Sequence, residues 1–150
     1  MNENLTVIIV VYKTKKELLK NFINQIDANY KILIVDNGFS YNFGEIENLQ
    51  NVSIYRSPVN QGNGDGINIG LRMVKSPYAI YFDIDTIFEN TFLSSIENYI
   101  TKIKSFCILL PNINSSNKSN EEFIEKYDGE GAIMLFNVRE VTNIGSFDTD

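Results

Sequence analysis

The stretch 78-YAIYFDIDTIF-88 places an apolar, β-favouring segment directly before two acids, Asp83 and Asp85. Side chains two apart in a strand point to the same side, so the two carboxylates converge if the extended conformation continues past Phe82. Converging carboxylates repel each other unless a cation lies between them, and a divalent ion with oxygen ligands is the usual solution. An isolated acid-x-acid pattern is also common in solvated turns. The pair by itself therefore leaves both interpretations open.

Five other short apolar segments predict further strands. They lie at residues 7–12, 31–35, 52–56, 106–110 and 131–136. Most are continuous rather than alternating, which is typical of strands covered on both faces. We therefore expect a sheet that is buried between helices.

Amphipathic segments between these strands predict helices. Residues 14–26 place several apolar side chains on one face, and Thr14 and Glu17 have the spacing of a capping box. Residues 67–74 and 91–103 show the same helical periodicity. This alternation predicts an α/β domain with a mostly parallel sheet, whose ligands bind beyond the carboxyl ends of the strands.

Length and composition narrow the classes of protein. The 150 residues, 43% of them hydrophobic, favour a single domain over residues 1–150, and the net charge of −6 disfavours binding to nucleic acid. With no histidine, any acid, base or metal chemistry depends on carboxylates, which favour magnesium or manganese over zinc. The lone Cys107 fits a reducing cytoplasm, and no signal peptide or membrane span is predicted.

Small and polar residues follow the predicted strands. After the second strand, Asp36 and Asn37 precede a glycine, which favours a turn. After the third, the glycine-rich residues 60–70 depart from the dinucleotide fingerprint, because Ile67 stands where the third glycine belongs. They still predict a tight loop that lets the backbone approach a ligand or a neighbouring strand, before a helix that begins near Asp65 or Gly66. Residues 112–120 are typical of a flexible surface loop.

Taken together, these segments resemble the family 2 glycosyltransferases of the GT-A fold, particularly their rhamnosyltransferase-like and capsule-building members. Five stretches carry the resemblance, in the family's order and over nearly the whole chain: 7-VIIVVYKTKKELLKNFI-23, 32-ILIVDNGFS-40, 60-NQGNGDGINIGL-71, 78-YAIYFDIDT-86 and 131-GAIMLFNVREVTNIGSFD-148. The resemblance implies a Rossmann-like, mostly parallel central sheet flanked by helices. It also implies a nucleotide-diphosphate-sugar donor linked to UDP, dTDP or GDP.

The resemblance further implies roles for individual residues on the donor side. Tyr12 would lie against the base, and Asp36 or Asn37 would contact it. The loop and helix that flank the ribose and diphosphate would include three further residues, Asn60, Gly62 and Asn68. Asp83 and Asp85 match the family's D-x-D motif, which handles the ribose and the metal-bound diphosphate. The implied cofactor is Mn²⁺ or Mg²⁺, which neutralises charge on the departing nucleoside diphosphate.

On the acceptor side the match is partial. Residues 128–132 only partly match the family's acceptor loop, which makes Glu130 a candidate, and Asp148 matches a motif aspartate near the end. The family's chain normally continues to an acidic pair that contains the base needed for inverting transfer to an acceptor hydroxyl. We therefore expect the base beyond Asp150, and a chain that lacks its C-terminal catalytic and acceptor portion.

The acceptor implied by the resemblance is a saccharide or a lipid-linked molecule of polysaccharide biosynthesis. A lipid-linked acceptor would mean peripheral association with the inner face of the membrane, and apolar surface exposed by a shortened domain would favour a homo-oligomer. Two alternatives stay open. One is a nucleotide-sugar-binding module without turnover. The other is a haloacid dehalogenase-type phosphatase with Asp83 as nucleophile and Asp85 as general acid.

Overall fold

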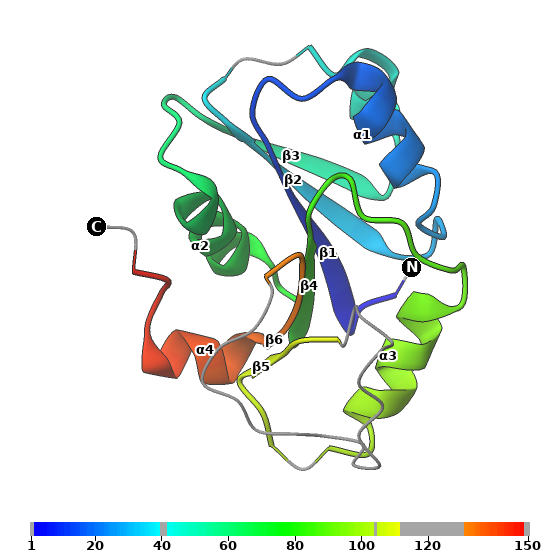
Figure 1. The fold of residues 1–150 in the computed structure, drawn as a ribbon, viewed down its shortest axis with the longest axis vertical. Helices are drawn as coiled ribbons and strands as arrows, with labels where there is room; N and C mark the ends of the chain where they lie inside the picture. Colours follow the sequence, from blue (N-terminus) through cyan, green and yellow to red (C-terminus); the bar gives the residue numbers. More distant parts are fainter. Residues whose placement is uncertain (1, 40–41, 104, 112–130, 149–150) are drawn as a thin grey trace.

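A six-stranded sheet runs through the centre of the computed structural model, which describes residues 2–39, 42–103, 105–111 and 131–148 (Figure 1). Its order is β3-β2-β1-β4-β6-β5. The first four strands are parallel, and β6 pairs antiparallel with both β4 and β5. The bounds are β1 (Leu5–Val11), β2 (Lys31–Asn37), β3 (Val52–Ser57), β4 (Tyr78–Phe82), β5 (Ile108–Leu109) and β6 (Ile133–Asn137). The prediction of a mostly parallel α/β sheet is confirmed.

Helices cover both faces of this sheet, because successive side chains along each buried strand point to opposite faces. Along β1, Val7 and Ile9 pack in the cluster that holds apolar side chains of α1 (Lys16–Ile23) and α3 (Phe92–Ile100). Ile8, between them, packs in the cluster on the face of α2 (Asn63–Met73) and α4 (Val138–Ile144). A short 3₁₀ helix, η1 (Gly44–Asn48), follows β2. The result is a three-layer α/β/α arrangement (Figure 1).

The helix α2 lies unusually close to β1 because two of its glycines face that strand. A Cβ atom added at Gly66 would lie 2.5 Å from Val10 Cγ1, and one added at Gly70 would lie 2.7 Å from Ile8 Cγ2. Both distances are shorter than side chains tolerate. Glycine at these positions therefore brings α2 against the sheet, and this sets where the first turn of α2 lies relative to the strand ends.

Some local predictions differ from the structure. The predicted capping box at Thr14 is wrong: Lys15 precedes the first residue of α1, and no side chain caps that end. Helix α2 begins at Asn63, earlier than predicted, because Gly62 already has the backbone conformation (φ 88°) that ends the preceding loop. Helix α4 was not predicted. The predicted loop at residues 112–120 lies outside the described residues.

Candidate functional site

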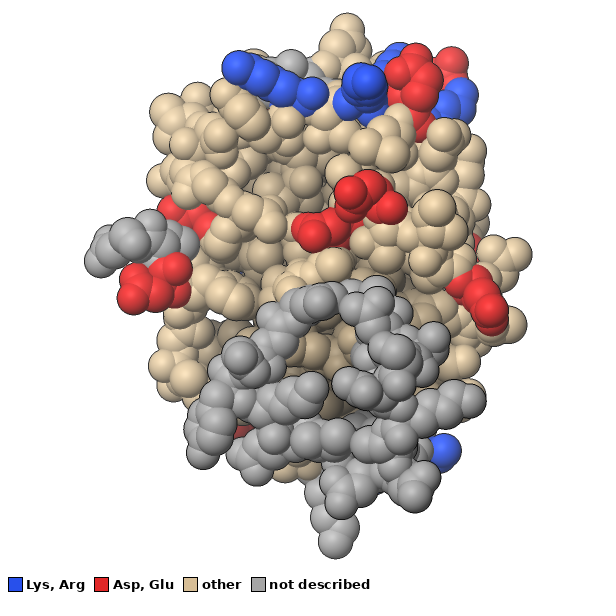
Figure 2. All heavy atoms as spheres, viewed as in Figure 1, with Lys and Arg blue, Asp and Glu red and all other residues tan. Residues whose placement is uncertain are grey.

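The parallel strands β1 to β4 end at the same edge of the sheet, which is where α/β domains bind ligands. The loops after β1 and β3 lie at the upper part of Figure 1, and the turn after β4 lies below them. In the space-filling view from the same side, Lys and Arg side chains gather along the upper edge and acidic side chains lie near the centre of the face (Figure 2). Both signs of charge thus lie near the strand ends.

Asp83 is held by a chain of hydrogen bonds at the end of β4. The buried Tyr81 hydroxyl donates to Asp83 Oδ1 at 2.5 Å, and Asn63 Nδ2 donates to the same hydroxyl at 2.8 Å. The backbone N–H of Asp83 donates to the carbonyl of Ala132 at 2.8 Å, just before β6. Asp83 is therefore linked through Tyr81 to Asn63, the first residue of α2, and through its own N–H to Ala132, just before β6.

Asp85 lies in a turn rather than in an extended strand. Strand β4 ends at Phe82, and the N–H of Thr86 donates to the carbonyl of Asp83 at 3.0 Å, which closes a turn around Ile84 and Asp85. Convergence of the two acids was predicted on the condition that the extended conformation continues past Phe82. The strand ends there, so strand alternation does not place the two carboxylates on one side. Asp83 is half-buried and Asp85 is exposed. Within the described residues, no group of three or more acidic or cysteine side chains could hold a metal ion.

Asn37 organises the loop between β3 and α2. Its Nδ2 donates to Asn60 Oδ1 at 3.0 Å and to the carbonyl of Gly62 at 2.7 Å, and its Oδ1 accepts from the N–H of Gln61 at 3.1 Å. The side chain is buried. Its amide is thus used to hold the loop that contains Asn60 and Gly62, both exposed. The contact of Asn37 with a base stays a prediction.

Tyr12 follows β1 and presents an exposed ring beside Gly38. A Cβ at Gly38, where φ is 131°, would lie 3.0 Å from Tyr12 Cε2, so glycine is needed for this close contact. The Lys13 ammonium lies 4.9 Å from the ring centre of Tyr12, and its hydrogen bond and charge lower the pKa of the Tyr12 hydroxyl. The ring is 44% exposed and is therefore accessible for stacking.

Asp36 lies at the end of β2, in register with Val11 on one side and Arg56 on the other. The side chain has no exposed surface. Asp36 would contact a base only after neighbouring side chains shift, and this contact stays a prediction. Beside it, Arg56 pairs with Glu47 at 2.6 Å and lies over the ring of Phe39, an exposed aromatic side chain that the sequence patterns did not indicate.

Asn68 contacts the C-terminal segment of the described chain. Its Nδ2 donates to the carbonyl of Phe147 at 3.0 Å, and its Oδ1 accepts from the N–H of Phe147 at 2.9 Å. The Phe147 ring packs edge-on against Phe136 of β6, with 5.9 Å between ring centres. Asn68 is 3% exposed, so its observed contacts are internal and its donor role stays a prediction. Asp148 follows directly and is exposed, whereas Glu130 lies outside the described residues.

We expect Asn68→Ala to release the segment at Phe147. Both hydrogen bonds are lost and two backbone groups lose their partner, which costs about 1–3 kcal/mol for each buried group left unsatisfied. Hydrogen exchange at the Phe147 amide should accelerate at least about tenfold. Asn24→Ala, at an exposed asparagine after α1, is the matched control and should change neither quantity. Unchanged protection of Phe147 in Asn68→Ala would contradict this role.

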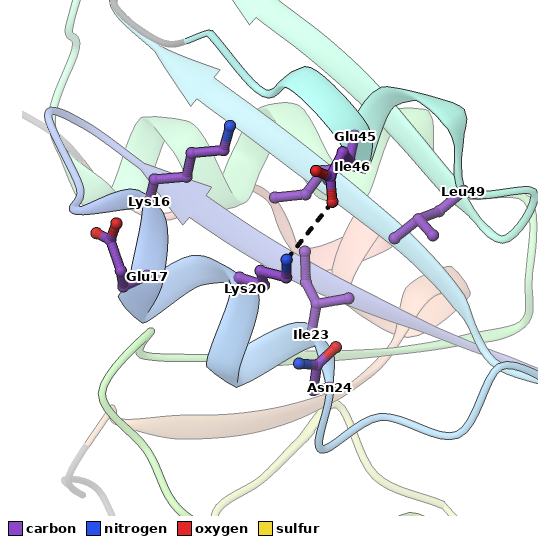
Figure 3. A pocket seen from close by; sticks show the side chains of 8 residues that line it. All are labelled: Lys16, Glu17, Lys20, Ile23, Asn24, Glu45, Ile46 and Leu49. Carbon is purple, nitrogen blue, oxygen red and sulfur yellow. Dashed lines mark hydrogen bonds and ion pairs between the residues drawn. The ribbon is translucent and has the colours of Figure 1, made fainter.

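A separate cavity of about 430 Å³ lies between α1 and η1 (Figure 3). Its lining residues are Lys16, Glu17, Lys20, Ile23, Asn24, Glu45, Ile46 and Leu49. Lys20 and Glu45 point toward one another across it, 3.5 Å apart, and both are largely exposed. An exposed ion pair contributes little to stability. None of the predicted site residues lines this cavity, so we treat it as distinct from the strand-end site.

Comparison with solved structures finds the same fold in other proteins. S. aureus TarS 1-349 matches with a TM-score of 0.70 at 17% identity, over 98% of this chain and 51% of that one. A mannosyltransferase from Pyrobaculum calidifontis, in complex with GDP-Man and Mn²⁺, matches with a TM-score of 0.71 at 15% identity, over 98% and 48%. The chain thus spans about half the length of these structures. A search of curated proteins found no match.

The six-stranded, mostly parallel sheet and its flanking helices define a domain of the GT-A class. The family model "Glycosyl transferase family 2" matches residues 6–144, which is nearly the whole chain. The protein therefore belongs to glycosyl transferase family 2. This membership confirms the resemblance drawn from the sequence and favours a transferase over the phosphatase alternative. None of the helices in the described part of the chain has the length and apolar character needed to cross a membrane.

Proposed function

We propose that this chain binds a nucleotide-diphosphate sugar together with Mn²⁺ or Mg²⁺ and forms the donor side of a glycosyl-transfer site. The observation that carries the proposal is the position of Asp83 after β4. The Tyr81 hydroxyl donates to Asp83 and accepts from Asn63, the first residue of α2, so that it bridges the two side chains. Family membership supports it. So does the fold shared with TarS, solved in complex with UDP-GlcNAc, and with the mannosyltransferase solved with GDP-Man and Mn²⁺.

The carboxylates of Asp83 and Asp85 fit a hard divalent cation. Magnesium-type sites commonly take one or two protein carboxylates and receive the other ligands from phosphate oxygens and water. Two acids in one turn, with no third acid grouped with them among the described residues, agree with such a site. When bound, the ion supplies Lewis-acid stabilisation of the leaving diphosphate. The side chains present therefore fit the proposed cofactor.

Other residues at the strand ends would bind and orient the nucleotide. The exposed Tyr12 ring offers a stacking surface for the base, and the buried Asp36 and Asn37 would lie beneath it. The loop that Asn37 holds, with Asn60 and Gly62, would lie along the ribose. The first turn of α2 directs backbone N–H groups toward negative charge, which favours the diphosphate there. Asn68 would contribute by keeping α2 and the C-terminal segment together.

The acceptor side is proposed in less detail. Transfer to a hydroxyl with inversion needs a carboxylate base, for which Asp148 and Glu130 are the candidates within the chain, with the family's acidic pair beyond Asp150 as the alternative. The acceptor would be a saccharide or a lipid-linked molecule, the latter at the inner face of the membrane. A module that binds the donor without turnover is the second interpretation. Transfer of sugar from a bound donor distinguishes the two.

We expect nucleoside diphosphates to stabilise the protein only when Mn²⁺ or Mg²⁺ is present. At a ligand concentration of 100 times Kd, binding adds about 2.7 kcal/mol to the free energy of unfolding. For a chain of this size each kcal/mol raises Tm by roughly 2–4 °C, so a rise of about 5–10 °C is expected. Thermal unfolding with UDP, dTDP and GDP, each with metal or with EDTA, measures this. The matched nucleoside monophosphates are controls. Equal shifts with and without metal would contradict the proposal.

A further inference from the structure

Tyr81 is the last residue but one of β4, and its side chain points to the α2 face, where it belongs to the buried cluster with Ile67 and Leu71. Only 2% of the residue is exposed. Its hydroxyl nevertheless reaches the site, because it lies between Asn63 Nδ2 at 2.8 Å and Asp83 Oδ1 at 2.5 Å. Tyr81 and Asp83 are two residues apart where β4 ends, and this spacing is the sequence signal for the contact.

The direction of the two hydrogen bonds is determined by their chemistry. The Asn63 Nδ2 group only donates, so the Tyr81 oxygen accepts from it and its single proton goes to Asp83. Asp83 Oδ1 is thus occupied by a donor. Asp83 Oδ2 makes no hydrogen bond to the described part of the chain.

We propose that Tyr81 is a positioning residue for Asp83, whose hydrogen bond to Oδ1 fixes the orientation of the carboxylate and presents Oδ2 to the donor and its metal. This inference rests on the proposed function, since it assigns Asp83 to the ligand site. It adds that Asp83 acts through one oxygen in a fixed orientation. A carboxylate that is already oriented loses less conformational freedom when a ligand binds, so a fixed Asp83 favours tighter binding.

The chain provides a matched comparison far from the site. Tyr30 donates its hydroxyl proton to Glu97 Oε2 at 2.8 Å, as Tyr81 donates to Asp83. Both tyrosines are buried, at 8% and 2% exposure. Tyr30→Phe and Tyr81→Phe therefore each remove one tyrosine-to-carboxylate hydrogen bond without changing the shape of the side chain. Only the second bond involves a proposed ligand-binding acid.

The test compares wild type, Tyr81→Phe, Tyr30→Phe and Asp83→Asn by calorimetric titration with UDP, dTDP and GDP, with Mn²⁺ and without metal. Whichever nucleotide binds wild type is carried through all variants. Tyr81→Phe should weaken the metal-dependent Kd roughly tenfold, the size of effect that a hydrogen bond to a charged group carries. Tyr30→Phe should leave Kd within about twofold of wild type. Thermal unfolding of each variant checks that both substitutions leave a folded protein.

The outcomes separate the inference from the proposed function. If Asp83→Asn abolishes metal-dependent binding while Tyr81→Phe binds within about twofold of wild type, the positioning role is overturned and the donor site stands. If Asp83→Asn binds as wild type does, the proposed donor site is overturned and this inference falls with it. If both tyrosine variants weaken binding equally, the effect is one of general stability and the positioning role is also overturned.

Discussion

Asp83→Asn should lower the affinity for a metal-bound nucleoside diphosphate roughly 30-fold to 4,000-fold, because removing one partner of a desolvated charged contact costs about 2–5 kcal/mol. Asparagine has nearly the shape of aspartate and keeps an oxygen that accepts from the Tyr81 hydroxyl, so the packing at the end of β4 is retained. The negative charge that a divalent ion requires is lost. Asp85→Asn should act in the same direction.

The matched control is Glu89→Gln, at an exposed acid that follows the same strand. It removes the same unit of charge four residues beyond Asp85, but outside the turn that Thr86 closes. Nucleotide Kd in the presence of Mn²⁺ should change by less than about threefold. If Glu89→Gln raises Kd as much as Asp83→Asn does, both changes result from the loss of overall negative charge, and a specific role for Asp83 is contradicted.

Gly66→Ala should destabilise the fold even though alanine is the better helix former. The new Cβ would lie 2.5 Å from Val10 Cγ1 and 3.0 Å from its Cγ2, atoms of a β-branched side chain that cannot rotate away cheaply. Overpacking of this kind costs about 1–3 kcal/mol, partly offset by about 1 kcal/mol of helix propensity. Gly66→Val adds two further methyl groups at the same contact and should lose more, measured as the free energy of unfolding in denaturant.

Val10→Ala provides the internal check, because it removes the methyl carbons that the new side chain meets. When Gly66→Ala is already present, Val10→Ala should lower the free energy of unfolding by less than it does in wild type, or should even raise it. Two additive losses would show that the contact between α2 and β1 is not the cause. A Gly66→Ala protein as stable as wild type would contradict the close packing of α2 on the sheet.

Much of this fold can be predicted from local patterns in the sequence. In the described part of the chain, continuous apolar runs and amphipathic segments predicted all six strands and three of the four α-helices, because burial on one face or two leaves a periodic signature. Helix α4 escaped prediction because it is short and has a single buried side chain, Val141. The capping-box prediction at the start of α1 is wrong because its residue pattern is common, and α1 begins without a side-chain cap.

The sequence by itself determined the class of the domain, its family and the placement of Asp83 and Asp85 after the fourth strand. These properties depend on residue type and order along the chain. Only the tertiary structure decided what each polar side chain contacts. Asn37 holds a loop more than 20 residues away, Asn68 holds Phe147 from 79 residues away, and Tyr81 joins Asn63 to Asp83. A buried amide or hydroxyl needs a partner, and the packing of distant segments chooses which one it finds.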